Sequence, residues 1–155
     1  MKELEEIYNK INNLNYLLDR KIEILNIILS ITKSQNVVFK EDKEVDCFIK
    51  MSLDEKQDLI NELINIDDMF LSIFESFKGG LNKNKSIFKE DLIQIKDKIQ
   101  QATDIDLKIR LQEEKNKNLI NNNISLNSKS KVNILKVSKE EMLKKYRDNK
   151  KDMRL

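Results

Sequence analysis

The chain has 155 residues, of which 39% are hydrophobic and 36% are charged, and its formal net charge is +2. This length supports one domain with a modest core, and the absence of Pro and Trp is more typical of a helical bundle than of a sheet protein. The chain has no His, which removes the commonest general base and metal ligand, so we expect no cofactor and no bound metal.

A single cysteine, Cys47, is present, so no internal disulfide can form and a reducing compartment is indicated. No segment approaches 18 consecutive apolar residues, so no transmembrane helix is expected. The first ten residues, MKELEEIYNK, are acidic and amphipathic and do not resemble a signal peptide. These features predict a soluble cytoplasmic protein.

The first predicted element is a long helix over about 2–39. Apolar residues recur there in steps of three and four, which places one apolar stripe on a helix. The stripe consists of Leu4, Ile7, Ile11, Leu14, Leu18, Leu25 and Ile28, and Thr32 and Gln35 fill its later positions. Tyr8, Leu17, Ile24 and Leu29 widen this stripe. A stripe of this width is typical of a helix that packs against two partners in a bundle.

The second predicted helix follows the charged break KEDKEVD at 40–46 and runs from about 43 to Gly79-Gly80. Ser52 and Glu55 have capping-box spacing, so a short helix could instead end near 51 and a new one start after Ser52. The apolar stripe keeps its phase across this point, which favours one continuous helix. The glycine pair predicts a C-terminal stop.

The third predicted helix starts after the loop LNKNKS at 81–86, with Asn84 or Ser86 as its N-cap, and ends at about 125. Its stripe is diluted in the second half by Asp106, Glu113 and Asn116, while Leu107, Leu111 and Leu119 add apolar surface on a neighbouring face. Three segments of similar length with short connections predict an all-α fold, an antiparallel three-helix hairpin bundle or coiled coil over 1–126.

The last segment, 127–155, carries ten Lys and Arg residues against four Asp and Glu residues, a balance of +6. The remainder carries 19 against 23, a balance of −4. Ser138 and Glu141 form a capping box that predicts a short helix over about 138–150 in a partly flexible tail. Its basic residues alternate with acidic ones and its apolar area is small, so nucleic acid and membrane are both unlikely partners. A solubilising end without a partner is the simplest alternative.

No arrangement of residues in the chain predicts catalysis, so we expect that the protein is not an enzyme. The adjacent carboxylates, such as Glu5-Glu6 and Asp67-Asp68, point about 100° apart on a helix and do not converge. A phosphate loop requires Gly-Lys-Ser or Gly-Lys-Thr, and neither sequence follows the glycine pair. The remaining candidate is helical surface that receives the amphipathic helix of a partner or of a second copy.

Several stretches, in order and spacing, resemble the FlgN-type flagellar export chaperones. They are YLLDRKIEIL at 16–25, EDKEVD at 41–46, EKQDLINELINID at 55–67, NKNLINNNI at 116–124 and the basic end KKYRDNKK at 144–151. The basic end is longer here than the family pattern. The resemblance implies a cytoplasmic α-helical chaperone of flagellar type III protein export, active in flagellum assembly without an enzymatic step.

The resemblance also implies the partners. Such a chaperone binds the amphipathic terminal helices of hook–filament junction proteins and delivers these export substrates to the export apparatus, as a monomer or homodimer. Its C-terminal part makes the contacts, which here gives the candidates Leu119, Ile120, Ile124, Val132, Ile134, Leu135, Met142, Leu143 and Tyr146. A structural coiled-coil oligomerisation protein and a filament-cap chaperone of the FliT type are the alternatives.

Overall fold

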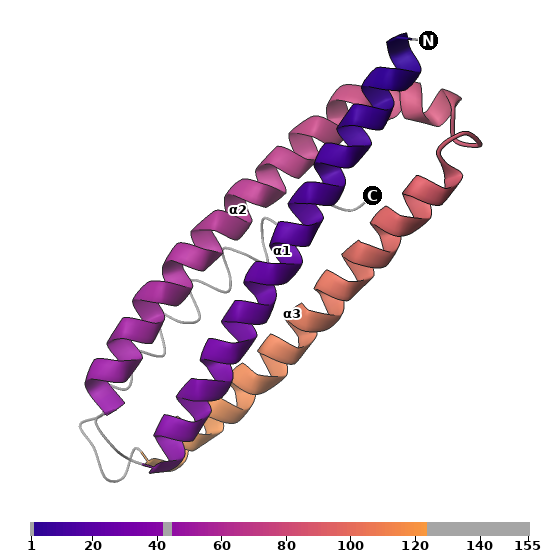
Figure 1. Cartoon of the computed structure of the whole chain (residues 1–155). Helices are drawn as coiled ribbons and strands as arrows, with labels where there is room; N and C mark the ends of the chain where they lie inside the picture. The colour runs from indigo at the N-terminus through magenta and orange to yellow at the C-terminus, as the bar shows by residue number, and fades with distance from the viewer. Residues whose placement is uncertain (1, 42–44, 124–155) are drawn as a thin grey trace.

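The computed structural model describes residues 2–41 and 45–123, which form three long helices (Figure 1). These are α1 (Lys2–Glu41), α2 (Val45–Lys83) and α3 (Lys89–Asn123). Each helix runs opposite to the one before it, so α3 is parallel to α1 (Figure 1). The described part of the chain contains no strand, which confirms the all-α prediction and the antiparallel hairpin bundle. No helix in this part is long and apolar enough to cross a bilayer.

Helix α2 is continuous through Ser52, as the unbroken apolar stripe predicted. The side chain of Ser52 is buried, and its hydroxyl donates to the carbonyl of Ile49 at 3.0 Å, within the helix. Ser52 is therefore an interior residue of α2, and the capping box that it forms with Glu55 does not start a helix.

The predicted stop of α2 at Gly79-Gly80 is wrong, because the helix continues to Lys83. A Cβ atom on Gly80 would lie 3.0 Å from Glu3 Oε1 and 3.3 Å from Ile7 Cδ1, so this glycine lets the first turns of α1 approach closely. The buried Leu81 then adds one more contact to the core beyond the glycines. Packing thus overrides the local preference of glycine for a helix end.

The turn between α2 and α3 is closed by Asn84. Its backbone N–H donates to the carbonyl of Leu81 at 3.0 Å, and its side-chain Nδ2 donates to the carbonyl of Gly80 at 2.8 Å. Asn84 therefore caps the end of α2. The predicted role of Asn84 or Ser86 as the N-cap of the next helix is wrong, because α3 begins at Lys89. The residue before it, the buried Phe88, accepts the first backbone hydrogen bond of α3 at its carbonyl, from the N–H of Leu92.

Helix α1 is the central element of the bundle. It packs along both α2 and α3, whereas the backbones of α2 and α3 hardly approach each other (Figure 1). Helices α2 and α3 therefore lie on either side of α1 (Figure 1). The position of α1 explains its wide stripe, since Ile11, Leu14 and Ile24 are all completely or almost completely buried.

The core changes character along the bundle. The end near the α2–α3 turn is apolar, and we call it the apolar half; its largest buried side chains are Phe70, Phe77 and Phe88, with Ile7 and Leu81 beside them. Phe74 and Phe77 meet edge to face there with ring centroids 6.1 Å apart. The opposite end, near the α1–α2 connection, buries a group of polar side chains.

Candidate functional site

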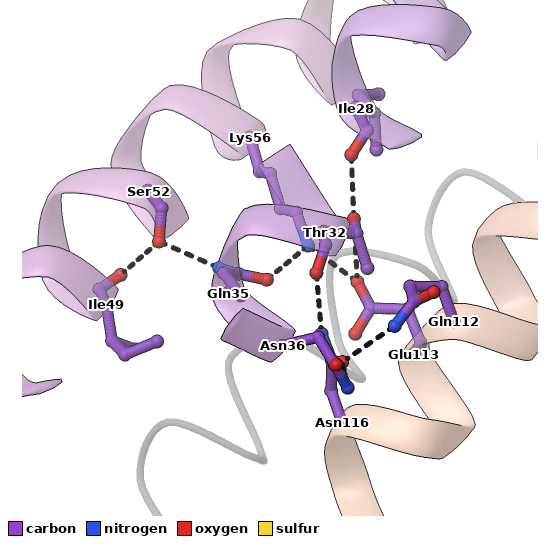
Figure 2. Close-up of polar contacts among 10 residues, drawn as sticks. All are labelled: Ile28, Thr32, Gln35, Asn36, Ile49, Ser52, Lys56, Gln112, Glu113 and Asn116. Carbon is purple, nitrogen blue, oxygen red and sulfur yellow. Dashed lines mark hydrogen bonds and ion pairs between the residues drawn. The ribbon is translucent and has the colours of Figure 1, made fainter. Parts of the chain in front are cut away.

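The most distinctive feature of the interior is a group of polar side chains from all three helices, which we call the polar layer (Figure 2). It contains Thr32, Gln35 and Asn36 of α1, Ser52 and Lys56 of α2, and Gln112, Glu113 and Asn116 of α3. Most of these side chains are buried, and a buried polar group is costly unless it is hydrogen-bonded.

Lys56 lies at the centre of the polar layer and links the three helices. Its ammonium donates to Gln35 Oε1 at 2.7 Å and to Glu113 Oε1 at 2.6 Å (Figure 2). The side chains of Lys56 and Glu113 are only 3% and 10% exposed. Gln35 also donates from Nε2 to the hydroxyl of Ser52 at 2.8 Å. The two buried charges thus compensate each other, and the amide oxygen of Gln35 is a second acceptor for the ammonium.

Asn116 forms the second junction, between α1 and α3. Its Nδ2 donates to the backbone carbonyl of Thr32 at 2.9 Å, while its Oδ1 accepts from Asn36 at 2.8 Å and from Gln112 at 3.2 Å. The hydroxyl of Thr32 donates to the carbonyl of Ile28 at 2.7 Å, and this places its oxygen 3.5 Å from Glu113 Oε1. A side-chain amide that bonds a backbone carbonyl of another helix fixes the axial position of the two helices.

The polar residues occupy positions that the apolar stripes would otherwise fill. Thr32 and Gln35 continue the stripe of α1, and Glu113 and Asn116 have the same spacing of three on α3. Polar residues at single core positions of a coiled coil cost stability but specify register and partner number. The hydrogen bonds of the polar layer join the three helices at this axial offset, so we assign the layer this role.

Ion pairs outside the polar layer join α1 to its two neighbours. The buried Lys21 lies 2.8 Å from Asp67 Oδ1 of α2, and Lys98 of α3 lies 2.9 Å from Asp19 Oδ1. At the surface, Arg20 forms a two-point bridge to Glu62 at 2.8 and 3.1 Å. The hydrogen bond that Arg20 donates to Glu62 raises the pKa of Arg20 above its ordinary value.

The polar layer does not have the geometry of a reaction centre. The ammonium of Lys56 is held by Gln35 and Glu113, and the whole group lies in the interior of the bundle. Among residues 2–41 and 45–123, no three His, Cys, Asp or Glu side chains gather into a group that could hold a metal ion. The described residues therefore direct attention to the outer surface of the helices.

Two of the nine predicted partner-binding residues lie in the described part of the chain. Ile120 is only 6% exposed and belongs to the core, and Leu119 is partly buried against it. The other seven, Ile124, Val132, Ile134, Leu135, Met142, Leu143 and Tyr146, lie outside the described residues, as does the predicted helix at 138–150. Their contacts with a partner stay a prediction.

Helix α3 carries exposed apolar residues on the side away from the core. Ile93, Leu107 and Leu111 are 49%, 50% and 58% exposed. At roughly 100° per residue they share one face, opposite the buried residues Ala102 and Ile109. We call this the outer face of α3. The sequence showed the extra apolar surface at Leu107 and Leu111, but it did not show that neither α1 nor α2 covers it.

Comparison with protein-family models, curated proteins and solved structures finds no match for this chain. The geometry of the bundle and the sequence resemblance are therefore the only guides to its function.

Proposed function

We propose that this protein is a non-enzymatic chaperone that binds amphipathic helices of other proteins, of the FlgN type in flagellar type III export. The resemblance of the helical segments suggests the family, and the long helical bundle is compatible with it. The proposed cargo is the terminal helices of hook–filament junction proteins, which the chaperone would keep from early assembly and deliver to the export apparatus in the cytoplasm.

The outer face of α3 is the observation that carries the proposal. Leu107 and Leu111 are four residues apart, one helical turn, and both are at least half exposed. An amphipathic helix presents anchors at the same spacing, so its apolar stripe fits along this face. Exposed charged residues, Asp104, Lys108 and Glu114, flank the two leucines and would pair with polar residues at the edge of the partner helix.

The expected affinity is moderate. Burial of about 600–800 Å² of apolar surface contributes roughly 15–20 kcal/mol before the costs of association and ordering, which offset most of it. A dissociation constant in the micromolar to nanomolar range follows, on the order of 8–12 kcal/mol of binding free energy. Such an affinity holds the cargo helix and still permits its release.

The same outer face supports a second function, a structural coiled-coil protein that assembles with itself. In that case Leu107 and Leu111 would pack against a second copy. Size-exclusion chromatography with light scattering of the full chain separates the two functions. A monomer or a concentration-dependent dimer agrees with the chaperone, whereas a stable higher oligomer at every concentration supports the structural protein.

Calorimetric titration tests the chaperone function directly. Peptides that correspond to the terminal helices of hook–filament junction proteins should bind the full chain with a one-to-one stoichiometry. Terminal peptides of a filament-cap protein serve as the comparison, and their preferential binding would indicate the FliT type instead. If no export-substrate helix binds at high micromolar concentrations, the proposed function is wrong.

A further inference from the structure

The buried side of α2 is wider than the part of it that lies against α1. Residues of α2 that are seven apart form rows along the helix. The central row is buried throughout and consists of Ile49, Lys56, Leu63, Phe70 and Phe77. One flanking row lies against α1, as the bond from Gln35 to Ser52 and the close approach of Gly80 to Ile7 show. The row on the other flank is Leu53, Ile60, Asp67, Phe74 and Leu81, and it too is buried except for the half-buried Phe74.

Helix α3 has the same organisation. Its central row is Phe88, Ile95, Ala102, Ile109 and Asn116, and the flank that includes Lys98 faces Asp19 of α1. The row on the other flank is Leu92, Ile99, Asp106, Glu113 and Ile120. Glu113 reaches Lys56 of α2, so this row faces α2.

These two flanking rows, one on α2 and one on α3, are the flanks that do not lie against α1. We call the surface between them the open side. The backbones of α2 and α3 hardly approach each other, although the long side chains of Lys56 and Glu113 meet between them. Nevertheless Leu53, Ile60 and Ile120 are no more than 6% exposed. A further element of the chain beside these residues would account for their low exposure, and residues 124–155 are the longest stretch outside the described helices.

We propose that the segment 131–155 packs along the open side as a fourth helix and completes a four-helix bundle. Its apolar residues Val132, Leu135, Met142 and Tyr146 recur in steps of three, seven and four, which forms one stripe on a helix. This stripe provides the partner that the two flanking rows require. The partly flexible tail that the sequence predicted over 127–155 concerns the same residues, which lie outside the described part of the chain.

Length and position favour this segment over a second copy of the chain. Seven residues, 124–130, separate it from the end of α3 at Asn123, which lies at the end of the bundle where α1 ends and α2 begins (Figure 1). The polar stretch 125–130 is long enough for a turn, after which the chain would run back antiparallel to α3. Twenty-five helical residues span about 37 Å, which covers most of the length of α3, about 52 Å.

Charge favours the same occupant. The open side includes the buried carboxylates of Asp67, Asp106 and Glu113. These are in ion pairs with Lys21, Arg110 and Lys56, so charge favours the segment through the overall balance of the chain. The segment 127–155 has a balance of +6, whereas the remainder of the chain has −4. Lys139 falls within the apolar stripe of the segment, between Leu135 and Met142, and would bring a positive charge to this side.

Amide hydrogen exchange of the full chain, without any partner, tests the inference. Amides of residues 132–146 should exchange at least tenfold more slowly than those of an unstructured peptide of the same sequence. The double substitution Leu135→Asp/Met142→Asp, on the stripe, should remove this protection. The matched change Val137→Asp, off the stripe, and Leu111→Asp, on the outer face of α3, should leave most of it in place.

Three results would overturn the inference: unprotected amides at 132–146 in the wild-type chain, protection that survives the double substitution, or protection that appears only in a dimer seen by light scattering. The last result would mean that the segment covers the open side of a second copy. The test is independent of the proposed function, because no cargo is present, and failure of cargo binding leaves its outcome unchanged.

Discussion

The apolar half and the polar layer, at the two ends of one bundle, differ in how strictly they constrain the positions of the helices. Near the α2–α3 turn, Phe70, Phe77 and Phe88 fill the space between helices with large apolar side chains. Near the α1–α2 connection, Lys56 and Glu113 occupy equivalent interior positions and must find partners at defined distances. An apolar contact is non-directional, so a helix that slips by one turn still buries apolar surface in the first half.

A slip by one turn has a different consequence in the polar layer. It would separate Lys56 from Glu113 and Asn116 from the carbonyl of Thr32, and it would leave buried polar groups without hydrogen bonds. We infer that the apolar half supplies most of the stability and that the polar layer selects one register. The predictions below test this division.

The largest effect is expected in the apolar half. Phe70 is 1% exposed, and Phe70→Ala should lower the free energy of unfolding by about 4 kcal/mol, through lost burial and the cavity that remains. Urea unfolding followed by circular dichroism measures this. Phe70→Leu, which keeps much of the volume, should cost clearly less. A cost of Phe70→Ala under about 1 kcal/mol would mean that this half is loosely packed.

In the polar layer the single and double substitutions should differ. Glu113→Leu leaves the ammonium of Lys56 buried without its carboxylate and should cost about 3 kcal/mol. The double change Lys56→Met/Glu113→Leu removes both charges and should recover most of this loss. Urea unfolding of Glu113→Leu, of the single variant Lys56→Met and of the double variant gives the coupling energy.

The double variant also tests the selection of register. If the polar layer selects it, Lys56→Met/Glu113→Leu should be stable but less uniquely packed, with broader amide resonances and faster hydrogen exchange at the polar end only. Sharp resonances and unchanged exchange throughout would show that the apolar contacts alone set the register.

The glycine pair offers a smaller test, confined to the apolar half. A Cβ on Gly79 meets nothing within 4 Å, so Gly79→Ala should raise the free energy of unfolding by about 1 kcal/mol through helix propensity. Gly80→Ala gains the same propensity but crowds Ile7 Cδ1 at 3.3 Å, so its net gain should be smaller or negative. Equal melting temperatures for the two variants would contradict the close approach of α1 and α2.

The surface bridge between Arg20 and Glu62 should have the smallest effect. Both side chains are more than a third exposed, so Arg20→Gln should cost no more than about 1 kcal/mol. Urea unfolding at low and at high salt should show the difference between wild type and variant shrinking as salt screens the pair. A difference that does not change with salt would indicate that Arg20 acts through packing.

Periodicity predicted the helices well because it reports which residues avoid water. The helix predicted over 2–39 is α1, Lys2–Glu41, and the continuous stripe predicted the unbroken α2. It did not predict the role of Gly80, since a glycine pair has the same pattern whether it ends a helix or allows a close approach. It placed Thr32 and Gln35 on the stripe, but their partners depend on the axial offset of helices, which a single stripe does not determine.

The same limit applies to the candidate site. The sequence placed Leu119 and Ile120 on an apolar face, and the structure covers Ile120 completely enough to make it a core residue. The sequence also showed that Leu107 and Leu111 are apolar, but it did not indicate that they are exposed in the folded bundle. Apolar residues on a wide stripe belong to the core or to a docking surface according to where the neighbouring helices lie, and that is a property of the assembled bundle.

The central functional claim, that α3 receives a cargo helix on its outer face, is tested most directly by one set of calorimetric titrations. The full chain, Leu107→Asp/Leu111→Asp and the control Met69→Asp are each titrated with terminal-helix peptides of hook–filament junction proteins. Met69 is 47% exposed on α2, so its substitution removes a similar apolar side chain from another surface. We expect the α3 variant to bind at least tenfold more weakly while Met69→Asp binds as the wild type does. Equal affinity of all three proteins, or a loss only in Met69→Asp, would contradict the assignment of the outer face of α3 as the binding surface.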